Sequence, residues 1–211
     1  MKSMTLKELK LIVEGVGKLE GWDFSRVRDG RDPLPWNYVD VVKQYLKPTD
    51  RVLDIGTGGG EIFLSLAPYF GEGVGIDDDA AMIKTAQLNQ SNLSIDNVSL
   101  MRMNGQDLQY NSEEFDVVLS RHVWVYTSEV VRVLRPGGYF IMQAVGIRSS
   151  QNFREAFGWV WSPDSEYHQS AADVAEEFRS HSCHIIALAV CRSENGISPV
   201  EHKIGPFSSE S

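Results

Sequence analysis

The chain has 211 residues, of which 42% are hydrophobic and 23% are charged, and its formal net charge is −9. This length and composition indicate a globular protein with one domain, or one domain and a small extension, that needs no metal or disulfide to stabilise its core. Net acidity disfavours a protein that binds nucleic acid with its whole surface, although a local basic patch remains compatible with it. The charge is unevenly spread, because residues 1–48 carry a net +2 and the rest of the chain a net −11.

Features that the sequence lacks disfavour several other classes of protein. The first residues contain no apolar segment typical of a signal peptide, and no run approaches the roughly 18 apolar residues of a membrane helix. In a strand, Cys183 and Cys191 would lie roughly 26 Å apart, which is too far for a disulfide. No spacing of metal ligands is present in the sequence. We therefore expect a cytoplasmic protein with reduced cysteines, no metal and no membrane contact.

The beginning of the chain is expected to form a helical segment. Residues 5–18 place apolar side chains at helical spacing behind a possible Thr5 cap, and a second helix is expected at about 36–46. The polar stretch between them is typical of a solvated loop, although its arginines are also compatible with phosphate contact (Arg26, Arg28 and Arg31). We predict that residues 1–48 cover the substrate side of a core formed by 49–211.

From residue 51 the sequence alternates between strand and helix patterns. Apolar runs of strand length stand at 51–56, 73–77, 98–103, 115–120, 138–145 and 183–190. Helical patterns stand between them at 61–67, 79–88 and 128–134, and within 151–180. Apolar strands separated by helices indicate an α/β fold, in which a doubly wound and mostly parallel sheet carries helices on both faces.

A glycine-rich loop follows the first strand, in the sequence VLDIGTGGGE. Gly56, Gly58 and Gly60 permit a tight turn and a close approach of the backbone to a ligand. Such loops bind dinucleotides or S-adenosylmethionine. The dinucleotide fingerprint G-x-G-x-x-G requires a small third residue, but Glu61 stands there, and its carboxylate would repel a pyrophosphate.

An acidic residue ends the second strand, 23 residues after Asp54. At that point of a βαβ unit, the carboxylate of Asp77 can accept hydrogen bonds from both ribose hydroxyls of an adenosine. Asp78 can share this role, whereas Asp79 is placed to cap the following helix. The loop and the acid together therefore predict a ligand that contains adenosine.

Four segments, VLDIGTGGGE, GVGIDDDAAMI, FDVVLSRHV and EVVRVLRPGGYF, resemble in this order the motifs of class I S-adenosylmethionine-dependent methyltransferases, over about residues 50–145. The longer pattern resembles a bacterial subgroup of unknown substrate. The resemblance implies a methyltransferase enzyme with a Rossmann-like sheet of about six or seven strands. The sixth strand would be 183–190, and the only candidate for an antiparallel seventh is 197–205, which Pro199 interrupts. An uncovered sheet edge there would favour a homodimer.

The resemblance also implies roles for individual residues. Gly56, Thr57 and Gly58 would present backbone groups to the methionine end of the cofactor. Asp54 would fix the loop and reach towards the amino group of the cofactor, while Asp77 would hold the ribose.

Three further positions carry over from the family. Asn104 and Gly105 would face the adenine, where related enzymes often have an aspartate; an asparagine oxygen can still accept the bond. Ser120 would line the floor of the pocket. The RPGG sequence at 135–138 is interpreted as structural, with its glycines turning a helix end into a strand.

Methyl transfer from a sulfonium is an in-line displacement, for which alignment alone can supply about 7 to 11 kcal/mol. A general base adds a factor of roughly 10² to 10⁴ where the acceptor must lose a proton. His122 is the candidate base, because it follows the fourth strand at the edge where such sheets bind ligands, and Arg121 is a candidate to orient an anionic substrate. The alternative is that both residues have only local structural roles.

The sequence also disfavours some chemical classes of methyl acceptor. The fourth motif is Ser-Arg-His rather than the Asp/Asn-Pro-Pro-Tyr of enzymes that methylate exocyclic amino groups, and it has no Pro-Cys nucleophile. We predict a small-molecule acceptor. The alternatives are an RNA methyltransferase acting on a guanine ring nitrogen and a cofactor-binding partner protein without turnover. Aromatic residues also gather outside the cofactor motifs (Trp22, Phe24, Trp36, Tyr38, Trp124, Tyr126, Phe157, Trp159 and Trp161). They form either a substrate pocket, in which Trp36 and Tyr38 close over the cofactor, or part of the ordinary hydrophobic core.

Overall fold

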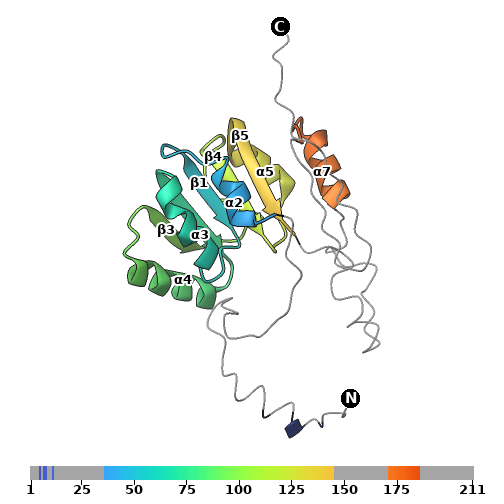
Figure 1. Ribbon diagram of the computed structural model, residues 1–211. Helices are drawn as coiled ribbons and strands as arrows, with labels where there is room; N and C mark the ends of the chain where they lie inside the picture. The colour runs from blue at the N-terminus through green and yellow to red at the C-terminus, as the bar shows by residue number, and fades with distance from the viewer. Residues whose placement is uncertain (1–4, 6, 9–10, 12–35, 145–170, 186–211) are drawn as a thin grey trace.

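A computed structural model describes residues 5, 7–8, 11, 36–144 and 171–185, and within them the chain forms a five-stranded parallel sheet (Figure 1). The strands are β1 (Arg51–Ile55), β2 (Glu72–Asp77), β3 (Val98–Arg102), β4 (Phe115–Arg121) and β5 (Leu134–Gln143). Their order in the sheet is β3-β2-β1-β4-β5, and every pair is parallel. The chain therefore winds outward from β1 in both directions, which leaves a crevice at the carboxyl ends of β1 and β4.

Helices cover both faces of this sheet. They are α2 (Tyr38–Lys43), α3 (Glu61–Leu66) with the 3₁₀ helix η1 (Ala67–Tyr69), α4 (Ala80–Leu93), α5 (Thr127–Val133) and α7 (Ala171–Ser180). One buried cluster joins α2, α3 and α4 to the sheet, and a second joins α5 and α7 to the opposite face (Figure 1). Val52 and Leu53 belong to different clusters because successive side chains of a strand point to opposite faces. The predicted doubly wound α/β fold is confirmed.

Side-chain caps set the starts of two helices. The Asn37 side chain accepts hydrogen bonds from the Val39 and Asp40 amides, so α2 begins at Tyr38, two residues later than the predicted start at Trp36. The carboxylate of Asp79 accepts a bond from the Ala81 amide at 2.7 Å, as its predicted capping role requires. The helix α4 runs five residues beyond the predicted end at residue 88.

The amino-terminal helix α2 contributes to the core rather than lying over it. Tyr38 is 8% exposed and Val42 is fully buried, and both pack in the cluster that contains Val52 of β1. Their segment falls within the predicted 1–48 extension, whose boundary with the core at 49–211 stays a prediction.

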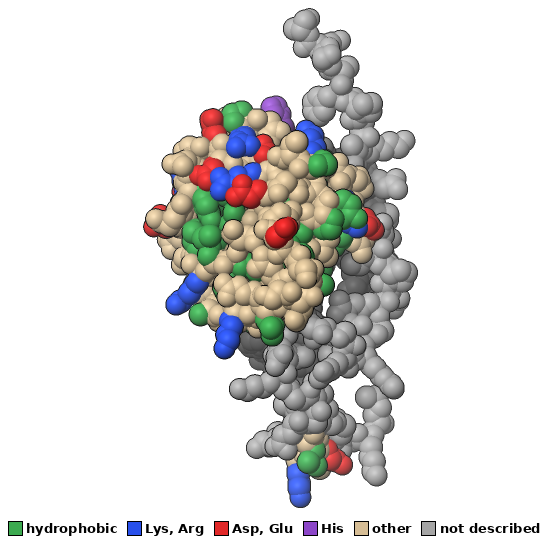
Figure 2. Space-filling view, turned by 90° about the vertical axis from the view of Figure 1, so that its left-hand side faces the viewer, with side chains coloured by type: hydrophobic (Ala, Val, Ile, Leu, Met, Phe, Trp, Pro, Cys, Tyr) green, Lys and Arg blue, Asp and Glu red, His purple; other side chains and the backbone are tan. Residues whose placement is uncertain are grey.

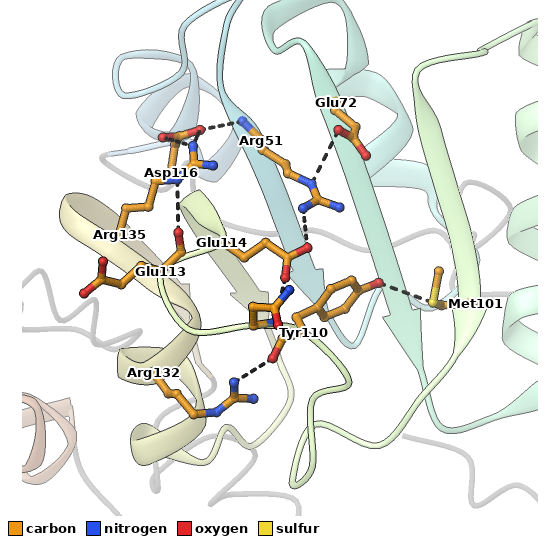
Figure 3. Close-up of polar contacts among 10 residues, drawn as sticks. Arg51, Glu72, Met101, Tyr110, Glu113, Glu114, Asp116, Arg132 and Arg135 are labelled. Carbon is orange, nitrogen blue, oxygen red and sulfur yellow. Dashed lines mark hydrogen bonds and ion pairs between the residues drawn. The ribbon is translucent and has the colours of Figure 1, made fainter.

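At the amino ends of the strands, opposite the crevice, a network of ion pairs and hydrogen bonds joins neighbouring strands (Figure 3). The Arg51 guanidinium pairs with Glu72 and with Glu114, and its backbone amide donates to the Asp116 carboxylate at 2.8 Å. The guanidinium also lies over the ring of Phe115, with 5.1 Å between its carbon and the ring centroid. These contacts join β1, β2 and β4 away from the crevice.

The last strand differs from its predicted form. Leu134 pairs with Phe115 and Tyr139 with Val117, so β5 begins at Leu134 rather than at residue 138. The RPGG residues form an irregularity within this strand, and Gly137 has a left-handed φ of +78°. The helix α5 already ends at Val133, before these residues, and the strand begins at Leu134. The RPGG residues therefore lie inside the strand and do not form the predicted helix-to-strand turn.

The predicted count of six or seven strands is corrected to five for the described part of the chain. Cys183, His184 and Ile185, which open the predicted sixth strand, have no strand conformation, and the Cys183 amide instead donates to the Phe178 carbonyl at the end of α7. The remainder of that strand, the predicted seventh at 197–205 and Cys191 lie outside the described residues, as does most of the helix predicted at 5–18.

Two kinds of feature are absent from the described residues. They contain no helix that combines the length and apolar character needed to cross a bilayer. They also contain no group of His, Cys, Asp and Glu side chains arranged to hold a metal ion.

Candidate functional site

A cavity of about 280 Å³ lies at the carboxyl ends of β1, β2 and β4. Six of the predicted site residues line it (Gly56, Asp77, Asp78, Asn104, Gly105 and His122). Trp124 and Tyr126, from the segment after β4, complete its wall. Its position is that of the crevice where doubly wound sheets bind ligands, and its lining mixes apolar side chains with a few polar groups.

The glycine loop is held against the end of β2 and packs closely on the segment after β4. The amides of Gly56 and Thr57 both donate to the Ile76 carbonyl at 2.9 Å. Gly56 has a φ of +76°, and a Cβ added to it would meet the Val123 side chain at 2.5 Å. Only glycine fits this position, because both the backbone conformation and the close neighbour exclude a larger residue.

The carboxylate of Asp77 links the glycine loop to the start of α4. One oxygen accepts a hydrogen bond from the Gly58 amide and the other from the Asp79 amide, both at 2.9 Å. Each carboxylate oxygen has a second lone pair, so Asp77 can still accept bonds from a ligand in the cavity. Thr57 and Gly58 are not among the residues that line the cavity, so this part of the glycine loop lies behind the cavity wall.

A cluster of buried polar groups lies behind the cavity, between β1 and α2. Asp54 is 9% exposed, and burial raises the pKa of its carboxyl to about 7. The neighbouring Thr57 hydroxyl lowers this pKa, Asp77 raises it and Arg121 lowers it. The hydroxyl does not reach a hydrogen-bond geometry with Asp54, and within the described structure it has no partner.

Tyr38 brings a second hydroxyl without a partner to the same cluster. Its oxygen is buried and makes no hydrogen bond within the described residues. Burial raises the pKa of Tyr38, the charge of Asp54 raises it further, and Arg121 lowers it. The hydroxyls of Tyr38 and Thr57 and the carboxyl of Asp54 therefore retain hydrogen-bonding capacity that a polar ligand can satisfy.

The end of β4 carries the three remaining predicted residues. Ser120 is fully buried, does not line the cavity and donates to the Val123 carbonyl at 3.4 Å, so it supports the segment after β4. Arg121 is exposed, and its Nε donates to the Gln143 side chain at 2.7 Å. His122 lines the cavity, and its amide donates to the Gln143 carbonyl at 2.8 Å.

His122 has an unusual backbone and a lowered pKa. Its φ of +60° is in the left-handed region, which costs a residue with a Cβ roughly 1 to 2 kcal/mol. Partial removal of the ring from water lowers the pKa of His122, and the charge of Arg121 lowers it further. The lowered pKa favours the neutral imidazole, the form in which the ring can accept a proton.

The asparagine predicted to face the adenine lies in the cavity wall in a tight turn. Its side-chain oxygen accepts a bond from the Gln106 amide at 2.8 Å, which leaves one lone pair on that oxygen and both amide hydrogens of Asn104 for a ligand. Among the aromatic candidates, Trp124 and Tyr126 line the cavity, whereas Trp36 packs against the core. The other predicted aromatics lie outside the described residues (Trp22, Phe24, Phe157, Trp159 and Trp161).

Sequence reasoning missed Gln143, which holds both Arg121 and His122. Its signal is its place at the carboxyl end of β5, directly beside Arg121 in the sheet register. That neighbour becomes visible only once β4 and β5 are known to be adjacent.

Comparisons with known proteins agree with this geometry. Residues 53–142 match a family described as a methyltransferase domain. Over 99 residues the chain is 30% identical to the uncharacterised methyltransferase YcgJ of Bacillus subtilis, covering 44% of this chain and 39% of that protein. Over 131 residues it is 27% identical to the ribosomal protein L11 methyltransferase of Geobacillus thermodenitrificans, covering 60% and 42%. Over 100 residues it is 36% identical to phthiotriol/phenolphthiotriol dimycocerosates methyltransferase 1 of Mycobacterium ulcerans, covering 43% and 36%.

Solved structures show the same fold. The crystal structure of YcgJ matches with a TM-score of 0.58 and 21% identity, over 68% of this chain and 66% of that one. A SAM-dependent methyltransferase from Aquifex aeolicus matches with a TM-score of 0.55 and 19% identity, over 72% and 81%.

The chain spans about two fifths of the length of the curated relatives it matches, so the match concerns the domain that carries the four motifs. The predicted family is confirmed for that domain, and S-adenosylmethionine is the cofactor of this family. Residues 53–142 therefore form a methyltransferase domain of the class I S-adenosylmethionine-dependent type.

Proposed function

We propose that this chain transfers a methyl group from S-adenosylmethionine to a small-molecule acceptor at the cavity between β1 and β4. One observation carries the proposal: His122, with a lowered pKa, lies in the wall of the same cavity as Gly56 and Asp77. A candidate base and the candidate adenosine ligands thus share one space of about 280 Å³, near the lower limit of the volumes of small-molecule sites.

The residues of the cavity wall and of the polar cluster behind it fit the cofactor chemically. The Asp54 carboxyl and the hydroxyls of Tyr38 and Thr57 match the charged methionine end, which carries both an ammonium and a carboxylate. Asp77 retains lone pairs for ribose hydroxyls, and Asn104 retains groups for the adenine. When bound, the cofactor supplies a methyl group on a sulfonium, which is already activated for displacement.

The residues of this chain would mainly align the reactants and move a proton. Alignment of donor and acceptor accounts for about 7 to 11 kcal/mol in such reactions. His122, whose lowered pKa favours the neutral imidazole, would accept the proton that the acceptor loses from its place in the cavity wall. Arg121, held by Gln143, would face an anionic group of the acceptor.

The charge distribution supports a small acceptor over RNA. The predicted core at 49–211 carries a net −11, which opposes binding of a phosphate backbone. On the described part of the face shown in Figure 2, acidic and basic side chains are interspersed, without a continuous basic patch. Relatives are named for acceptors as different as ribosomal protein L11 and phthiotriol dimycocerosates, so the domain is compatible with several acceptor classes.

Two further features of the proposal concern the rest of the chain. Residues 1–48 would cover the acceptor side of the core, and a sheet edge left uncovered because the predicted seventh strand does not pair would favour a homodimer. The runner-up functions are methylation of an RNA guanine ring nitrogen and a cofactor-binding role without turnover.

A labelled methyl group separates these possibilities. The protein is incubated with S-adenosylmethionine carrying a tritiated methyl group and a bacterial extract, and the products are divided into small molecules, RNA and protein. We expect label in the small-molecule fraction. Label in RNA or protein alone would overturn the proposed acceptor class. Cofactor binding measured by calorimetry without label in any fraction would support the role without turnover.

A further inference from the structure

An ion pair on α5 joins the helix to the connection between β3 and β4. Glu129 and Arg132 lie one turn apart and make two contacts of 2.7 Å, from Nε to one carboxylate oxygen and from Nη2 to the other. Arg132 lowers the pKa of the Glu129 carboxyl, so the pair is ionised. A bidentate pair of this kind has a fixed geometry, which distinguishes it from a loose surface contact.

The same two side chains also bind the backbone of the connection. Glu129 accepts a bond from the Leu108 amide at 2.8 Å. Arg132 donates to the Leu108 carbonyl at 2.8 Å and to the Tyr110 carbonyl at 2.6 Å, the latter drawn in Figure 3. Both polar backbone groups of Leu108 are therefore held by the ion pair, and its side chain is buried in the core.

This connection forms one wall of the cavity, and the segment before α5 forms another. Asn104 and Gly105 line the cavity shortly before Leu108, and the Asp107 amide bonds back to the Asn104 carbonyl at 3.3 Å, which makes this stretch compact. Tyr126 lines the cavity directly before α5. The ion pair thus connects the two walls at a point just outside the cavity.

We propose that Glu129 and Arg132 are positioning residues that set the distance between these two walls and so determine the affinity for the adenosine end of the cofactor. The inference rests on the proposed placement of the cofactor in this cavity. It also gives a role to the Glu-x-x-Arg part of the EVVRVLRPGG motif, in which neither residue lines the cavity.

Arg135 provides a matched control on the same connection. Its guanidinium contacts both oxygens of Asp116 at 2.7 Å and donates to the Glu113 carbonyl at 3.1 Å (Figure 3). It therefore makes the same kinds of bond as Arg132, but at the amino end of β4 and not beside the cavity. A loss of affinity caused by general loosening would appear in R135K as well as in R132K.

The test compares two ligands that share the adenosine end. Dissociation constants of S-adenosylhomocysteine and of 5′-methylthioadenosine, which lacks the amino-acid group, are measured by calorimetry alongside the melting temperature. R132K keeps the positive charge but loses the planar guanidinium that binds both carboxylate oxygens. The dissociation constants of both ligands should rise about tenfold, and by the same factor. E129Q, which keeps an oxygen for the Leu108 amide, should show a smaller rise of about threefold. R135K should stay within about twofold of the wild type for both ligands.

The outcomes separate the positioning role from the placement of the cofactor, with D77N as a reference. If D77N weakens both ligands while R132K and E129Q do not, the positioning role alone is overturned. If none of the three variants weakens either ligand, the placement in this cavity fails and the positioning role fails with it. An equal loss in R135K, or a loss in R132K confined to S-adenosylhomocysteine, also overturns the positioning of the adenosine end.

Discussion

The carboxylate of Asp77 accepts a hydrogen bond from the Gly58 amide at 2.9 Å, which ties the acid at the end of β2 to the glycine loop after β1. The two residues are 19 positions apart, and the bond fixes the loop before any ligand binds. Because the same carboxylate faces the cavity, one group both shapes the loop and offers lone pairs to a ribose.

Replacement of Asp77 should therefore weaken cofactor binding through both roles. We expect D77N to raise the dissociation constant of S-adenosylhomocysteine by about ten- to a hundredfold, because a charge-assisted bond is worth about 1.5 to 3 kcal/mol. Calorimetry measures the constant. D79S serves as the control, since serine also caps helices and should leave the affinity nearly unchanged. Wild-type affinity in D77N would contradict the ribose role.

The raised pKa of Asp54 should make cofactor binding depend on pH. Below about pH 7 its carboxyl is protonated, whereas the cofactor's ammonium favours the ionised form. We expect affinity to rise by about tenfold per pH unit up to about pH 7 and then to level off, with a proton released on binding. Calorimetry in two buffers of different ionisation enthalpy counts that proton. D54N should bind weakly with a flat pH profile, and an unchanged slope in D54N would exclude Asp54 as its origin.

The same group should lower the stability of the ligand-free protein at high pH. The folded state binds the Asp54 proton more tightly than the unfolded chain does, so this stabilisation is complete below the ordinary pKa of 3.8 and is lost as pH rises through about 7. The upper limit of the effect is about 4 kcal/mol, at roughly 1.4 kcal/mol per pH unit. Urea unfolding should show D54N to be more stable than the wild type at pH 8, with a smaller difference at pH 5. D96N, at an exposed acid, should show no such dependence.

Removal of the His122 ring should reduce turnover without unfolding the protein. Asparagine tolerates the left-handed φ of +60° but cannot act as a base, so H122N keeps the backbone requirement and loses the proton acceptor. We expect kcat on an identified acceptor to fall by about 10² to 10⁴, with the melting temperature preserved. The wild-type rate should fall at acidic pH as the imidazole becomes protonated, at a pKa below its ordinary value. Full turnover in H122N would leave His122 a structural role only.

Removal of the Tyr38 hydroxyl should have opposite effects on stability and binding. Because the buried hydroxyl has no partner within the described residues, Y38F should leave the melting temperature of the free protein unchanged or raise it. If the hydroxyl binds the methionine end of the cofactor, the same change should weaken S-adenosylmethionine several-fold and leave 5′-methylthioadenosine unaffected. Calorimetry with both ligands checks this, and equal affinities for S-adenosylmethionine in Y38F and the wild type would contradict it.

Much of the site was visible in the sequence because its signals are local. Alternating strand and helix patterns, the spacing of Gly56, Gly58 and Gly60, and the Asp79 cap each depend on a few neighbouring residues. The acid after the second strand could be placed at the crevice because parallel strands end at one edge of the sheet. Helix lengths were less accurate, since α4 continues to Leu93. In this last part of the helix, the Asn89 and Gln90 side chains donate to the carbonyls of Gly59 and Val98, which lie outside the helix.

The sequence by itself therefore determined the α/β class, the type of methyltransferase domain and six of the residues that line the crevice. Only the tertiary structure decided that Tyr38 lies beside Asp54, that Gln143 holds Arg121 and His122, and that the Glu129–Arg132 pair binds the backbone of Leu108. These contacts join residues from about 16 to 24 positions apart on different elements, apart from the helical pair itself. No local pattern encodes them, because they depend on which strands are neighbours and on which face each helix packs.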